Sequence, residues 1–68
     1  MTAPETRRQI ADIIARELLA SLKAGELKVI GIDQIRLAIK RRVPTVRFGS
    51  TEYEKIEEAT TRRLVMLV

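Results

Sequence analysis

The first third of the chain carries apolar side chains at helical spacing around more than half of a helix circumference. At about 100° per residue they fall in one arc, with Ile13 and Ala20 at its edge. The arc consists of Ile10, Ala11, Ile14, Ala15, Leu18, Leu19 and Leu22. A helix that is apolar over so wide an arc must be covered on two sides, within its own fold or by another subunit.

The chain of 68 residues is short enough to be one domain, residues 1–68, with a small core. Domains of this size are often assisted by disulfides, metals or partners. The chain has neither Cys nor His, which excludes disulfides and the commonest metal ligands, and we expect no metal and no cofactor.

Eight Ile, seven Leu and five Val are a large aliphatic load for so few residues, so we expect a homodimer. The predicted partner interface consists of Ile10, Ile13, Ile14, Leu18, Leu22, Leu64 and Leu67. Apolar runs are far shorter than the roughly 18 residues that span a bilayer, and no signal-peptide pattern is present. We therefore expect no membrane segment and a cytoplasmic location.

The predicted fold is mainly α, with helices over residues 3–24, 33–43 and 51–63. In the first helix, Thr2 and Glu5 have the spacing of a capping box, and Pro4 suits a first turn. Gly25 supplies the left-handed residue that ends this helix.

For the second helix the sequence predicts Asp33 as N-cap, with Ile32 packing against Leu37, and Pro44 stops the helix. Its expected buried stripe consists of Ile35, Ala38 and Ile39. The third helix is expected to begin with a capping box of Thr51 and Glu54. Tyr53 and Ile56 should face the core.

Two short links, residues 28–31 and 45–48, are expected to be extended because they contain β-branched residues beside Gly or Pro. Residues 64–68 are apolar throughout and could continue the helix or form an edge strand. We expect this tail to be buried, since an exposed one would promote aggregation.

Five cations stand between Gln34 and Thr51 with no acidic residue among them. They are Arg36, Lys40, Arg41, Arg42 and Arg47. Cations near a helix C-terminus also complement its dipole, so a solvated face explains the cluster about as well as phosphate binding does. The dominance of arginine favours the phosphate-binding interpretation, because the planar guanidinium group matches the geometry of phosphate oxygens.

The order of elements resembles a winged helix-turn-helix. Its features are residues 32–39, the turn at Pro44 and a third helix that opens with residues 51–56. The segment from Ile35 to Ile56 is similar to the ferric-uptake-regulator type of this domain, in which a proline-containing turn leads into a third helix with Thr and Tyr near its start. The resemblance implies a third helix in the major groove of DNA, with Ser50, Thr51, Tyr53 and Lys55 near the bases. Residues 29–40 also look like the last link and helix of a histone-like fold, a second choice that likewise implies a DNA-binding dimer.

The leading hypothesis is a small basic DNA-binding protein, a transcriptional regulator or nucleoid-type protein. Its predicted nucleic-acid contacts are Arg36, Lys40, Arg41, Arg42, Arg47, Ser50, Thr51 and Lys55. The alternative is a structural or adaptor subunit that inserts the first helix and residues 64–68 into a larger protein assembly. We do not expect an enzyme, because Ser21 and Ser50 have no His partner and no glycine-rich phosphate loop exists.

Overall fold

The computed structural model of this chain describes residues 6–68 and contains three helices. Helix α1 spans Arg7–Lys23, α2 spans Ile32–Arg42 and α3 spans Thr51–Leu67. Residues 6–68 contain no β-strand, so the predicted mainly α fold is confirmed. No helix in this part of the chain is long and apolar enough to cross a membrane.

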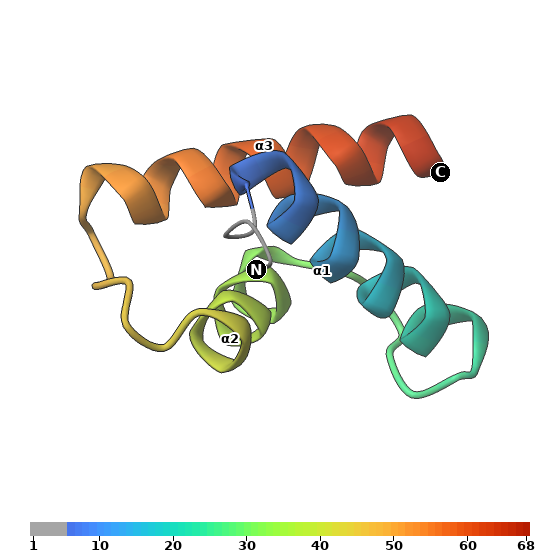
Figure 1. The fold of residues 1–68 in the computed structure, drawn as a ribbon. Helices are drawn as coiled ribbons and strands as arrows, with labels where there is room; N and C mark the ends of the chain where they lie inside the picture. Colours follow the sequence, from blue (N-terminus) through green and yellow to red (C-terminus); the bar gives the residue numbers. More distant parts are fainter. Residues whose placement is uncertain (1–5) are drawn as a thin grey trace, which may run out of the picture.

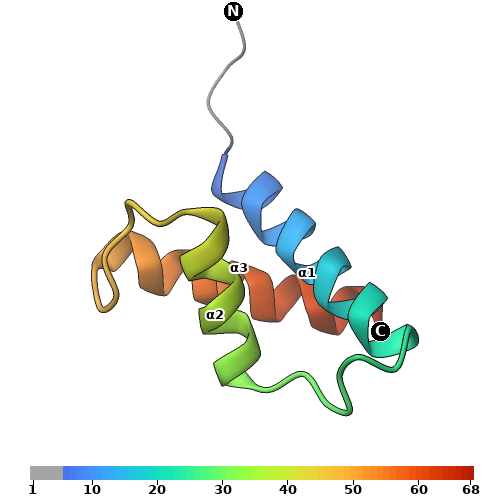
Figure 2. The same cartoon turned by 90° about the horizontal axis from the view of Figure 1, so that it is seen from below.

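The fold is built around the crossing of α1 and α3, which make the most extensive contacts in the molecule. Both helices run toward the same end of the molecule, where the C-terminus lies (Figure 1). The shorter α2 contacts both of them and lies below α3 in that view. Figure 2 shows α2 in front of α3 when the molecule is turned.

Helix α1 begins at Arg7, with Thr6 as its N-cap. The Thr6 hydroxyl accepts a hydrogen bond from the Gln9 amide, and the Gln9 side chain accepts one from the Thr6 amide at 2.8 Å. This reciprocal pair satisfies two amides that lack intrahelical partners. The capping box predicted from Thr2 to Glu5 lies outside the described residues.

The predicted end of α1 at Gly25 is confirmed. Gly25 has a φ of 80°, in the left-handed region that a side chain disfavours. The Gly25 amide donates to the Leu22 carbonyl at 3.2 Å and the Glu26 amide to the Ser21 carbonyl at 2.9 Å. These two bonds close the last turn in the manner of a Schellman motif.

Helix α2 begins one residue earlier than predicted, and its N-cap is Gly31 rather than Asp33. The Gly31 amide donates to the Gln34 side chain at 2.8 Å, so the cap is made from inside the helix. Ile32 is therefore the first helical residue, and both it and Leu37 are exposed. The predicted stop at Pro44 is correct, because α2 ends at Arg42.

Helix α3 has Ser50 as its N-cap, so the predicted Thr51 cap is wrong by one residue. The Ser50 hydroxyl accepts from the Tyr53 amide at 3.2 Å. The helix continues past residue 63 to Leu67, because no Gly or Pro interrupts it. The apolar tail is thus helical, and its burial is partial. Leu64 is buried and Leu67 packs against the core, whereas Val65, Met66 and Val68 are exposed.

The link at residues 45–48 is made of turns rather than the extended segment predicted. The link at residues 28–31 forms no strand, although the backbone of Gly31 is extended. After α2, the Val46 amide donates to the Val43 carbonyl at 3.0 Å, and the Ser50 amide donates to the Arg47 carbonyl at 3.1 Å. Gly49 has a φ of 83°, which suits the third position of a type II turn. Hydrogen-bonded turns thus form the link after α2, and neither link has a partner strand in residues 6–68.

The core lies where the three helices meet. Ile14, Ile39 and Ile56 are at most 1% exposed, and the predicted burial of Ile35 and Tyr53 is confirmed. The buried residues that form the core cluster are Ile10, Ile14, Ala15, Leu18, Ile35, Ile39, Tyr53, Ile56 and Leu64. Most of the wide apolar arc of α1 is therefore covered on two sides within one chain, by α2 and by α3.

The position of the α3 cap can be tested with two neighbouring alanine substitutions. Because the Ser50 hydroxyl caps α3, we expect Ser50→Ala to lower the free energy of unfolding by about 1 kcal/mol. Thr51→Ala should change it by less than about 0.5 kcal/mol, because Thr51 is an exposed residue inside the first turn. Chemical denaturation measures both values, and a larger cost for Thr51→Ala than for Ser50→Ala would contradict the cap.

Candidate nucleic-acid interface

The predicted basic cluster occupies the last turn of α2 and the turns that follow it. Lys40, Arg41 and Arg42 form the end of the helix, where positive charge is favoured by the helix dipole. Arg47 follows in the connection to α3, and all four side chains are exposed. The structure thus places these four predicted contacts near one end of α2.

Arg36, the fifth predicted cation, is exposed but contacts two other parts of the chain. Its Nε donates to the Glu57 carboxylate of α3 at 3.3 Å. Its guanidinium also lies over the Phe48 ring, 5.3 Å from the ring centroid. Phe48 in turn meets Tyr53 edge to face, at 5.1 Å between centroids. Arg36 therefore joins α2 to α3 and to the segment between them.

The start of α3 holds the remaining predicted contacts, which the structure places differently. Thr51 and Lys55 are exposed. The Ser50 hydroxyl is engaged twice, accepting from the Tyr53 amide and donating to the Arg47 carbonyl at 2.7 Å. Tyr53 is 4% exposed, and burial raises the pKa of its hydroxyl, with the nearby Glu57 adding to the rise. Of the four residues that the resemblance places near DNA bases, only Thr51 and Lys55 have free side chains on the surface.

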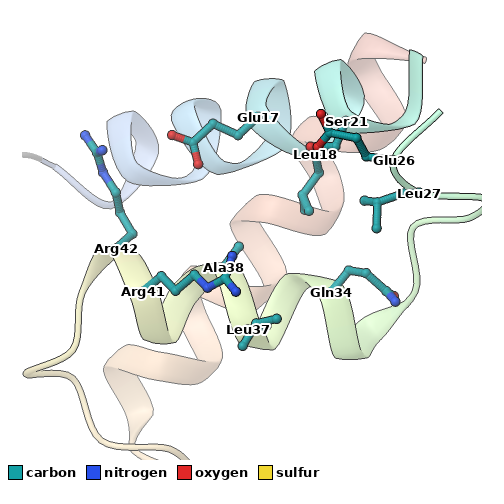
Figure 3. Close-up of a pocket in the computed structure, with 10 residues that line it drawn as sticks. All are labelled: Glu17, Leu18, Ser21, Glu26, Leu27, Gln34, Leu37, Ala38, Arg41 and Arg42. Atoms are coloured by element: carbon teal, nitrogen blue, oxygen red, sulfur yellow. The ribbon is translucent and has the colours of Figure 1, made fainter. Parts of the chain in front are cut away.

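A groove of about 450 Å³ separates α1 from α2 beside the basic cluster (Figure 3). Glu17 of α1 and Arg41 of α2 project from its facing walls. Leu18, Leu27 and Leu37 provide an apolar part of the lining. Carboxylates therefore stand opposite part of the cluster, which the acid-free sequence between Gln34 and Thr51 did not indicate.

The other ion pairs tie the ends of α1 and α3 together. Arg7 donates to the Glu52 carboxylate at 3.0 Å, and this bond lowers the pKa of Glu52 and raises that of Arg7. Asp12 accepts from Arg63 at 2.6 Å and from Arg16 at 3.0 Å. The hydrogen bond from Arg63 is the main reason that the pKa of Asp12 is lowered.

Sequence reasoning missed these contacts because most of them join residues far apart in the chain. Arg7 and Glu52 are 45 positions apart, and Asp12 and Arg63 are 51 positions apart. Only the bond between Asp12 and Arg16 had a local signal, since the two stand four residues apart on one helix. Asp12 belongs to the polar side of α1, and the structure makes it a link to α3.

The predicted partner interface lies mostly inside the chain's own core. Ile10, Ile14, Leu18 and Leu64 are buried without any second subunit. Ile13, Leu22 and Leu67 are partly buried. The burial of the first four residues thus has an explanation within one chain, and the homodimer stays a prediction.

Asp12 offers a test of the link between α1 and α3 through pH. Because its folded pKa lies below the ordinary value of 3.8, its stabilising effect is present above that value and is lost as the pH falls through the folded pKa. We expect Asp12→Asn to lower the free energy of unfolding at neutral pH, with a difference from wild type that shrinks below about pH 4.

Denaturation across this pH range measures the effect. Glu26→Gln is the control, since Glu26 is exposed in the link after α1. A loss in the free energy of unfolding by Asp12→Asn that does not change with pH would contradict a stabilising Asp12 carboxylate. The same loss in Glu26→Gln would also contradict it.

Comparisons of the chain with protein-family models, with curated proteins and with solved structures found no match. The resemblances to a winged helix-turn-helix and to a histone-like fold therefore stay predictions. Among residues 6–68, no group of three or more Asp or Glu side chains is placed to hold a metal ion. What this surface does must be inferred from its own charges and contacts.

Proposed function

We propose that this chain binds DNA through the phosphate backbone. The observation that supports this function is the exposure of Lys40, Arg41 and Arg47 near one end of α2, without a carboxylate paired to any of them in residues 6–68. Arg42 lies on the same turn of α2 and adds to the local charge. Contacts between exposed cations and phosphates favour binding, because each contact releases counterions from the DNA.

Backbone contact fits this surface better than base reading. Reading base edges requires side chains that are free to reach into a groove. At the start of α3, Ser50 is engaged in the helix cap and Tyr53 is buried, which leaves Thr51 and Lys55. We therefore favour a nucleoid-type protein that binds many sequences over a sequence-selective regulator.

The apolar end of α3 supports a second candidate, an adaptor subunit of a larger protein assembly. Val65 and Met66 are more than two-thirds exposed, and Val68 is 91% exposed. Exposed apolar side chains clustered within one helical turn are a feature of protein interaction sites. In this candidate the contact surface is the outer side of the tail, because Leu64 is already used in the core.

Binding of a short fluorescent DNA duplex at several salt concentrations tests the DNA proposal. For the variant K40Q/R41Q/R47Q we expect the slope of log affinity against log salt to fall by about three. Its affinity at about 0.1 M salt should fall roughly a hundredfold, because three phosphate contacts are lost. Two duplexes of unrelated sequence should bind with similar affinity.

The control is K23Q/K28Q, which removes two exposed lysines outside the cluster and should lower the salt slope by much less than the cluster variant. V65S/M66S/V68S tests the adaptor candidate and should leave DNA binding unchanged. DNA binding that is absent at low salt, or equally weakened in K23Q/K28Q, would refute the proposed surface.

A further inference from the structure

A second basic surface lies in a groove between α1 and α3, here called the α1–α3 groove. Its cations are Arg7, Arg8, Lys55, Arg62 and Arg63, and Glu58 is its one acidic lining residue. All the residues that line it belong to α1 or α3, and none belongs to α2. The groove is therefore separate from the basic cluster at the end of α2.

Two of these arginines are held in place by carboxylates. Glu52 binds Arg7, and Asp12 binds Arg63. Even when these two carboxylates and Glu58 are counted, the five cations of the groove remain in excess. A guanidinium fixed by one carboxylate retains further N–H donors for a second anion.

The other three cations of the groove are exposed. Arg8, Lys55 and Arg62 form no ion pair within residues 6–68. Glu58 stands four residues before Arg62, the spacing of a helical ion pair, yet the two are not bonded in the described structure. Positive charge in the groove is thus only partly neutralised by the chain itself.

The groove is also open enough for a chain of phosphates. Its volume is about 710 Å³. Ala11 and Ala59 lie between the charged side chains, and their small size keeps the lining low where the helices approach each other. A low lining edged by cations from two helices suits an extended anion better than a compact one.

We infer that the α1–α3 groove holds the phosphodiester backbone of a second DNA segment. This inference rests on the proposed function, in which the cluster at the end of α2 holds the first. No residue of α2 lines the groove, so the two surfaces use different side chains. One chain then bridges two DNA segments, as a protein that compacts DNA would.

A bridging assay tests this inference with the full chain. One duplex is fixed on beads, and capture of a second, fluorescent duplex is measured as protein is added. Wild type should capture the second duplex. With R8Q/R62Q, the amount of second duplex captured should fall at least about tenfold. The slope of log capture affinity against log salt should fall by about two, because two phosphate contacts are removed. K23Q/K28Q removes the same charge elsewhere and should behave as wild type.

The outcomes separate the groove from the cluster. Binding of the first duplex by R8Q/R62Q with loss of capture supports the inference. Wild-type binding without capture, or full capture by R8Q/R62Q, overturns it, since the second case would mean that paired copies bridge through the cluster. If K40Q/R41Q binds and R8Q/R62Q does not, the proposed function fails while the groove stands as the phosphate site. Thermal unfolding of each variant confirms that it is folded.

Discussion

The packing of α1 against both α3 and α2 is the constraint on which the rest of the structure depends. Ile14 and Ala15 of α1 are fully buried, and Ala11 is 2% exposed. Small side chains at two of these positions let α1 approach its neighbours closely, and the isoleucine fills the space between them. Burial of most of this arc within one chain needs no second subunit, and the homodimer stays a prediction. Function must then be sought in the charged and exposed side chains that remain.

Much of the fold could be predicted from the sequence because local signals were strong. Gly25 and Pro44 marked two helix ends correctly, and helical spacing identified the buried faces of all three helices. The predicted cap of α3 was one residue off because two hydroxyl residues, Ser50 and Thr51, stand side by side at its start. Ser and Thr are both favoured N-cap residues, so the sequence alone does not distinguish them. The path of the preceding turn determines which of the two hydroxyls caps the helix. At α2 the cap is Gly31, two residues before the predicted Asp33.

The candidate site was less predictable, because folding brings together charged residues that are far apart in the sequence. Arg36 belonged to an acid-free segment, yet Glu57 from another helix pairs with it. The α1–α3 groove shows the reverse effect, since its cations come from two distant segments that each also carry acidic residues. The packing of the helices brings these cations together, and it places most acidic side chains of the same segments outside the groove.

We claim that one chain buries its own core and keeps most of its basic side chains exposed. The most direct test is the midpoint of thermal unfolding measured over a wide range of protein concentrations without DNA. A core completed within one chain predicts a midpoint that does not change with concentration. A midpoint that rises steadily with concentration would show that folding is coupled to association, and would contradict the claim.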